Sequence, residues 1–134
     1  MYRRLLCYVE AGETRLEELE RVLDLASQLQ SRLIVLAVLP EEPEESTKEE
    51  KEKRDILEDR IWNSLYQIED VAFGRELKIS LMLEEGKPEE TIASVVKSYE
   101  VDLCATFPYK GLDAELLLQK LGSTPLLFFN QEGR

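Results

Sequence analysis

The amino-acid sequence predicts an α/β protein with three layers, in which a mostly parallel sheet is covered by helices on both faces. Short apolar runs of strand length alternate with longer segments whose apolar residues recur at helical spacing. Most of these runs carry no charge, which is typical of strands buried on both faces. The chain of 134 residues has the common length of one domain, and we expect a single domain over residues 1–134.

The first part of the chain predicts a strand, a helix and a second strand. Leu5–Val9 is a short uncharged run, and Leu33–Leu39 is a longer one that ends at Pro40. Between them, Thr14 and Glu17 have the spacing of a capping box and predict the start of a helix.

A charged segment, residues 41–53, follows the second strand and predicts a solvated loop that leads into a helix. Ser46 and Glu49 have the spacing of a second capping box, and the helix should be established from about Lys51. Gly74 is expected to close it. The buried stripe of this helix should consist of Leu57, Ile61, Leu65 and Ile68.

The second half predicts a half-exposed strand and then three shorter elements. Leu77–Leu83 alternates between apolar and polar residues, which indicates an edge strand. Gly86 should turn the chain, and Pro88 suits the first position of a helix. Its apolar stripe should consist of Ile92, Val95, Val96 and Tyr99. The last three elements are expected to be a strand, a helix and a strand, over Val101–Phe107, Leu112–Leu121 and Pro125–Phe129.

Charge and composition exclude several classes of function. The net charge of −11 repels phosphate backbones and anionic lipids, so we expect neither a nucleic acid nor a membrane as partner. No apolar run approaches the roughly 18 residues that span a bilayer. The apolar run near the first residue is too short for a signal peptide, which favours a cytoplasmic protein.

Histidine is absent, which removes the usual general base and the commonest metal ligand, so we expect no catalytic residues and no metal site. Cys7 and Cys104 both lie within apolar runs and are expected to be buried thiols that serve packing in a reducing compartment. A redox role or a disulfide between them is the alternative.

Three segments carry a resemblance to a known family. They are LLCYVEAGETRLEELERVLDLASQLQSRLIVLAVLP, EEGKPEETIASVVKSYEVDLCATF and STPLLFF. They are similar, in order and spacing, to the opening strand–helix–strand, the later Gly-x-Pro turn with its helix and Asp-containing strand, and the closing Pro-led strand of the universal stress protein family. The resemblance covers nearly the whole chain. It implies a Rossmann-like, adenine nucleotide alpha hydrolase-like sheet of five parallel strands in the order 3-2-1-4-5.

In such a sheet, ligands bind where the strand order reverses, beyond the carboxyl ends of the first and fourth strands. The residues that the resemblance places at or near this point are Glu10, Ala11, Gly12, Val38, Phe107, Tyr109, Lys110 and Gly111.

Three of these candidates carry specific chemistry. Glu10 could accept hydrogen bonds from a ribose or an adenine, or it is a solvated loop carboxylate. Tyr109 could stack on a ring and Lys110 could meet a phosphate, or both belong to an ordinary loop surface.

The sequence departs from the family at the phosphate loop. Nucleotide-binding members carry G-x2-G-x9-G-[ST] after the fourth strand, whereas only Gly111 and Gly122 occur in this part of the chain. Gly122 also falls where the last helix ends, not where it begins. We therefore expect a small soluble binding or regulatory module of the stress response, not an enzyme and not a strong ATP binder.

Three alternatives remain. The first is a member that binds ATP with Mg²⁺ and hydrolyses it slowly. The second is an enzyme such as an ATP pyrophosphatase-type ligase, whose first loop does not match residues 10–14. The third is a purely structural role, for example in heterodimers with nucleotide-binding relatives.

The last predicted strand is apolar and lies at a sheet edge, and such edges invite pairing with another chain. Many members of the resembled family dimerise through this strand, so a homodimer is expected. The alternative is that the C-terminal residues or the short helix cover the edge. The residues concerned are Pro125, Leu126, Leu127, Phe128 and Phe129.

Overall fold

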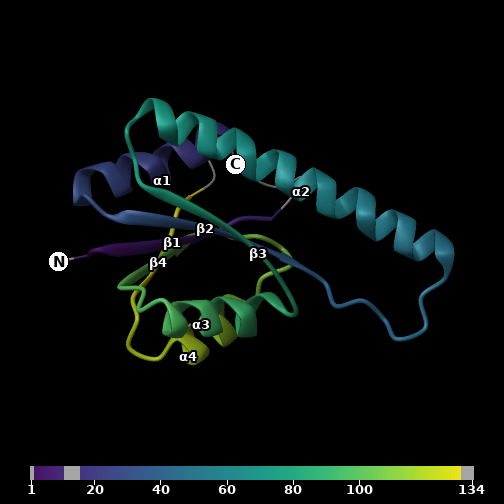
Figure 1. Ribbon diagram of the computed structural model, residues 1–134. Helices are drawn as coiled ribbons and strands as arrows, with labels where there is room; N and C mark the ends of the chain where they lie inside the picture. The colour runs from purple at the N-terminus through teal and green to yellow at the C-terminus, as the bar shows by residue number, and fades with distance from the viewer. Residues whose placement is uncertain (1, 11–15, 131–134) are drawn as a thin grey trace.

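A computed structural model describes residues 2–10 and 16–130 of the chain, and within them strands and helices alternate from the first element to the last (Figure 1). The strands are β1 (Arg4–Tyr8), β2 (Arg32–Leu39), β3 (Ile79–Glu85), β4 (Leu103–Thr106) and β5 (Leu126–Phe128). The helices are α1 (Leu16–Leu29), α2 (Lys48–Gly74), α3 (Pro88–Ser98) and α4 (Ala114–Leu121). The capping pair predicted at Thr14 falls outside the described residues.

The sheet confirms the predicted fold class and strand order. Its strands are all parallel and lie in the order β3-β2-β1-β4-β5. Figure 1 shows α1 and α2 on one face of the sheet and α3 and α4 on the other. Residues of β1 and β2 are almost all buried because both faces of these strands are covered, whereas β3 is only half-buried at the edge, as predicted.

Helix α2 begins three residues earlier than expected, and its cap differs by one residue from the prediction. Thr47 is the N-cap: the Glu50 N–H donates to Thr47 Oγ1 at 3.1 Å, and the Thr47 N–H donates to Glu50 Oε1 at 3.4 Å. The Ser46 hydroxyl instead donates to the Pro43 carbonyl at 3.0 Å, which holds Ser46 in the preceding turn. Two overlapping S/T-x-x-E patterns occur here, and the backbone of the loop decides between them.

The first half of α2 extends beyond the sheet (Figure 1). The buried residues of the helix therefore start at Ile61, and Leu57, one turn earlier, is 36% exposed. Helix α2 is long but rich in charge. Within residues 2–10 and 16–130, no helix combines the length and the apolar character needed to cross a bilayer.

The C-terminal end of α3 corrects a further prediction. Tyr99 was expected in the buried stripe but is 49% exposed, because the helix ends at Ser98 and Tyr99 is its C-cap. Its carbonyl accepts a hydrogen bond from Arg4 Nη1 at 2.8 Å. The other three predicted stripe residues, Ile92, Val95 and Val96, are buried.

The turn between β3 and α3 depends on glycine. Gly86 has a φ of +145°, and a Cβ atom added there would lie 2.8 Å from Thr91 Oγ1. We predict that Gly86→Ala lowers the free energy of unfolding by about 1–3 kcal/mol, because it adds both backbone strain and a steric clash. Urea unfolding measures the change. Gly74→Ala is the matched control: an added Cβ there meets nothing within 4 Å, so an equal loss in both variants would contradict the prediction.

Candidate functional site

The carboxyl ends of β1 and β4 bring two distant parts of the chain together. These strands pair in register, with Cys7 opposite Ala105, so Glu10 after β1 lies next to the loop after β4. A Cβ atom added at Gly111 would lie only 3.0 Å from Glu10 Oε1. The contact joins residues about 100 positions apart, and glycine at position 111 leaves room for the carboxylate.

The Glu10 carboxylate also meets a buried tyrosine. Tyr8 Oη donates to Glu10 Oε1 at 3.2 Å. Burial raises the pKa of Tyr8 far above its ordinary value, and the negative charge of Glu10 raises it further. Tyr8 therefore keeps its proton, and its hydroxyl remains available as a donor to Glu10.

The loop after β4 is built around aromatic side chains that belong to the core. Phe107 is fully buried and Tyr109 is 4% exposed. The Tyr109 ring packs edge-on against Tyr8, with 5.8 Å between centroids, and Phe107 lies 5.7 Å from Phe129. Tyr109, considered from the sequence as a platform for a ligand ring, thus forms part of the packed wall of the site.

The amino end of α4 is bonded to carboxylates of the protein itself. Asp113 is the N-cap, and its Oδ1 accepts from the Leu116 N–H at 3.1 Å. The Asp113 N–H donates to Glu89 Oε2 at 2.9 Å. Glu89 comes from the first turn of α3 and is only 8% exposed. Two negative groups therefore lie where a helix terminus would otherwise attract an anion.

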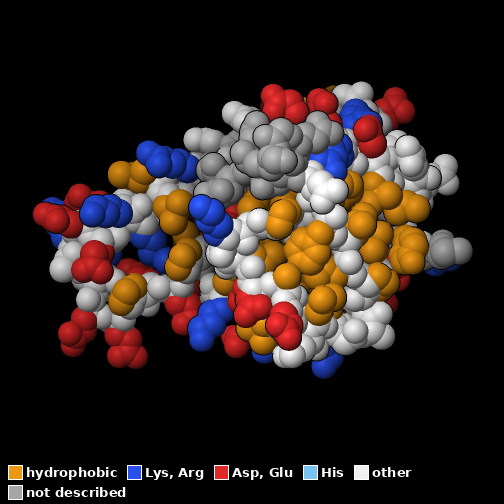
Figure 2. All heavy atoms as spheres, turned by 180° about the vertical axis from the view of Figure 1, so that it is seen from behind, with side chains coloured by type: hydrophobic (Ala, Val, Ile, Leu, Met, Phe, Trp, Pro, Cys, Tyr) orange, Lys and Arg blue, Asp and Glu red, His pale blue; other side chains and the backbone are white. Residues whose placement is uncertain are grey.

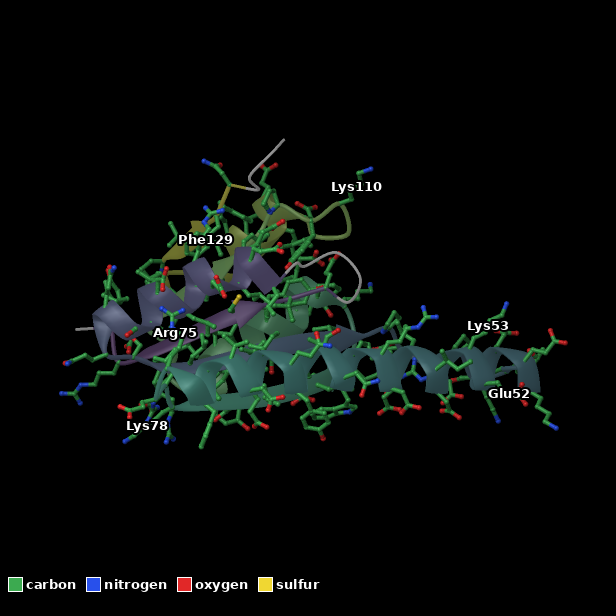
Figure 3. The ribbon with its side chains drawn as sticks, turned by 90° about the horizontal axis from the view of Figure 1, so that it is seen from above. Glu52, Lys53, Arg75, Lys78, Lys110 and Phe129 are labelled. Carbon is green, nitrogen blue, oxygen red and sulfur yellow. The ribbon has the colours of Figure 1, made fainter. Side chains whose placement is uncertain are left out.

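The remaining candidates are more dispersed. Lys110 is exposed, and Figure 3 shows its side chain pointing away from the loop that carries it. Val38 is half-buried in β2. Because β1 lies between β2 and β4, Val38 is separated from the loop after β4. Ala11 and Gly12 fall outside the described residues. The structure thus joins Glu10 to Gly111 and brings Tyr109 against Tyr8, but it turns Lys110 outward.

Sequence reasoning missed Tyr8 and Glu89 as parts of this site. Tyr8 lies inside an apolar run and reads as a core residue, and Glu89 follows Pro88 in the first turn of a helix, where an acidic residue is ordinary. Only their contacts with Glu10 and Asp113 reveal them.

A small cavity adjoins Glu10 on the face of the sheet that α1 and α2 cover. It has a volume of about 50 Å³ and lies between the end of β1, α1 and α2, where Val9, Leu19 and Leu65 contribute to its lining. Pockets that hold drug-sized ligands measure roughly 300–1,000 Å³. The cavity as formed by the described residues is therefore too small for a nucleotide.

The two cysteines lie on adjacent strands but not opposite each other. Cys7 pairs with Ala105, and Cys104 pairs with Leu6, so the two side chains point to opposite faces of the sheet. Both are free thiols with no solvent exposure. Burial raises the pKa of Cys104 to about 12, and it also raises the pKa of Cys7.

Comparison with known proteins gives one family. The model of the universal stress protein family matches residues 1–106. A search of curated protein sequences finds no match.

Several solved structures are similar to the chain. UspA from Lactobacillus plantarum has a TM-score of 0.79 at 14% identity, with 96% of this chain and 97% of that one covered. A universal stress protein in complex with cAMP has a TM-score of 0.73 at 15% identity, covering 96% and 97%. A family protein from Arabidopsis thaliana with AMP bound has a TM-score of 0.72 at 12% identity, covering 98% and 93%. At these identities the likeness demonstrates a shared fold.

The burial of both cysteines predicts that they resist thiol reagents. In the native protein at pH 8, the reaction of Cys7 and Cys104 with a chromogenic disulfide should be at least about 100-fold slower than that of a free thiol. Unfolding in urea should release both thiols at once. Rapid reaction of either cysteine in the native state would contradict packing as their role and revive the redox alternative.

Proposed function

The chain belongs to the universal stress protein family, and from this premise we propose that it is a binding and regulatory module without the family's glycine-rich ATP-binding loop. The proposal extends to the whole chain as one domain, in which α4 and β5 follow the matched residues and β5 is the last strand of the sheet. It also places the protein in the cytoplasm and assigns it a role in the stress response through binding, not catalysis.

The observation that carries the proposal is the pair of carboxylates at the amino end of α4. In nucleotide-binding members of the family, glycines after the fourth strand open the backbone to phosphate. Here, the Asp113 N–H is bonded to Glu89, and Asp113 in turn caps the helix. A phosphate at this point would meet like charges, and two unit charges about 4 Å apart near a protein surface repel by roughly 4 kcal/mol.

A second candidate function is the binding of a nucleotide, such as ATP with Mg²⁺, by a different arrangement of groups. Glu10 favours it, because this acceptor lies at the carboxyl end of β1 beside the β4 loop. Two of the similar structures carry cAMP or AMP, nucleotides with fewer phosphate charges than ATP. The two candidates differ in the charge that the site tolerates, and this difference can be measured.

Calorimetric titration separates them. We predict no heat of binding for ATP with Mg²⁺ at micromolar concentrations, because Glu89 and Asp113 repel the triphosphate. AMP and cAMP should be titrated in parallel. Micromolar binding of ATP to the unmodified protein would contradict the proposal, and Glu10→Ala and Lys110→Ala would then locate the ligand.

A separate variant tests whether the negative charge of Glu89 excludes phosphate. Glu89→Gln retains an oxygen that accepts from the Asp113 N–H but removes the charge. If the charge of Glu89 excludes phosphate, the variant should bind ATP at least about tenfold more tightly than the unmodified protein. Glu90→Gln is the matched control, since Glu90 is an exposed neighbour on the same helix. An equal gain in both variants would point to net charge and not to the site.

We further propose a homodimer through β5. The Cys104 N–H donates to the Pro125 carbonyl at 3.0 Å, and the Phe129 N–H donates to the Thr106 carbonyl at 2.9 Å. By alternation, Leu126 and Phe128 direct their backbone groups to the outer edge. Hydrophobic side chains gather on the face of the molecule seen in Figure 2, on the side away from β3. These features suit pairing with a second copy.

The chain partly protects this edge. The Arg21 guanidinium lies 5.1 Å from the centre of the Phe129 ring, and Arg21 also donates to the Asn130 carbonyl. The end of β5 is thereby fastened to α1. Only the short stretch Leu126–Phe128 remains for pairing, and within it Leu127 is 38% exposed.

Leu127→Asp tests the β5 dimer. We predict that it lowers the association constant of the dimer at least about tenfold, because the carboxylates introduced in the two copies repel each other across the edge. Light scattering after size-exclusion chromatography gives the mass. Leu118→Asp is the matched control, because Leu118 is 52% exposed on α4, outside the strand. If the unmodified protein is dimeric and the Leu127→Asp variant has the same mass, β5 is excluded as the interface.

A further inference from the structure

The opposite edge of the sheet is formed by β3, which with seven residues is longer than the three-residue β5. The Leu33 N–H donates to the Lys78 carbonyl at 2.9 Å, and the Gly86 N–H donates to the Leu39 carbonyl at 2.9 Å. Even-numbered residues of β3 therefore direct their backbone groups toward β2. The odd-numbered residues of the strand, Ile79, Leu81, Leu83 and Glu85, direct theirs outward. Just before the strand, the Leu77 N–H is already bonded to the Ala72 carbonyl at 3.1 Å.

We propose that this edge is a second self-association surface, on which another copy of the chain adds its own β3 in antiparallel orientation. The two-fold axis passes through Leu81, which pairs with the partner's Leu81. Ile79 then pairs with the partner's Leu83. The Leu81 pair and the two pairs of Ile79 with Leu83 are hydrogen-bonded pairs in this register, and the two sheets become continuous.

Charged side chains favour this register over the registers that are shifted by two residues. With the axis at Leu81, Lys78 lies opposite the partner's Glu84, and the same pair forms again on the other side of the axis. Shifting the pairing by two residues places Lys78 opposite Met82 or Gly86 of the other copy, so both ion pairs are lost. Opposite charges directly across an antiparallel pair stabilise it, and like charges destabilise it.

Both charged residues are available for such contacts. Lys78 and Glu84 are exposed, and neither forms an ion pair with another residue in the described part of the chain. Glu85, in contrast, is held by Arg54 at 3.2 Å. Figure 3 shows Lys78 at the outer margin of the molecule, on the side where α2 runs. The net charge of −11 opposes association of two copies, so local pairs of this kind are needed to hold the edge together.

Apolar surface beside the strand adds to the interface. Phe73 of α2 is 83% exposed, and together with Leu77 and Ile79 it forms the apolar part of a hollow of about 270 Å³, which Glu69 and Asp70 also line. In the proposed register the partner's Leu83 lies beside Ile79, at the mouth of this hollow. Tyr66, two helical turns before Phe73, is 52% exposed. A strand pair alone buries little area, and these side chains supply the further contact that a stable dimer requires.

Charge reversal at the edge tests the proposal, with sedimentation velocity at several protein concentrations and low salt as the measurement. Every protein carries Leu127→Asp, so that association through β5 does not contribute. We expect this parent to self-associate. Lys78→Glu should lower its association constant at least about tenfold, and so should Glu84→Lys, because each places like charges opposite each other twice per dimer.

The double variant Lys78→Glu with Glu84→Lys restores the opposite charges and should recover most of the parent's association constant. The matched controls are Lys53→Glu and Glu52→Lys, which make the same charge changes near the start of α2, at the opposite end of that helix from Lys78 (Figure 3). The controls should associate as the parent does.

Three results would overturn the proposal. The first is a parent that stays monomeric at every concentration. The second is an equal effect of Lys78→Glu and Lys53→Glu, and the third is a double variant that remains as weak as the single ones. Because the β5 variant is present throughout, none of these results bears on the β5 dimer or on nucleotide binding.

Discussion

The burial of β1 between two parallel neighbours is the constraint on which the rest of the structure depends. Its residues from Leu5 to Tyr8 are at most 2% exposed, so each backbone N–H and C=O group must find a partner within the protein. Hydrogen bonds to β2 on one side and to β4 on the other meet this need. The strand order therefore reverses beside β1, and the carboxyl ends of β1 and β4 form the rim where the candidate site lies.

That rim is filled by the protein's own groups. Tyr8 donates to Glu10, Glu10 lies against Gly111, and Glu89 accepts from the amino end of α4. The first and the last of these contacts are hydrogen bonds, and each satisfies a polar group that burial would otherwise leave costly. The bond to Glu89 also uses an N–H group from which a phosphate would otherwise accept. Stability of the loop and affinity for an anion therefore compete, and in this chain the Asp113 N–H is bonded to a carboxylate of the protein.

The two edges of the sheet differ in their capacity to pair. Strand β5 is short, and Arg21 contacts the residues at its end, whereas β3 is seven residues long, is preceded by Lys78 and ends with Glu84 and Glu85. Charged residues on an edge strand discourage indiscriminate pairing. At β3 their positions also make the edge complementary to itself, so the residues that exclude most other strands specify a second copy of the same chain.

The sequence by itself determined the elements and the layering. Uncharged runs such as Leu33–Leu39, turn residues such as Gly86 and Pro88, and apolar stripes at helical spacing are local signals that act over a few residues. They predicted every strand and helix within a few residues, and the alternation predicted the parallel sheet. The resemblance to the family supplied the strand order. It also indicated Glu10 and the β4 loop as the site.

Only the tertiary structure decided which of the protein's own side chains fill that candidate site and which edge of the sheet is complementary to itself. The contact of Glu89 with Asp113 and the burial of Tyr109 join segments far apart in the sequence, and they depend on how strands and helices dock. The choice of Thr47 over Ser46 as a cap depends on the path of the preceding loop. Which backbone groups of β3 face outward depends on its pairing with β2. Local patterns do not encode such relations, because each is set by the register between elements and not by the elements alone.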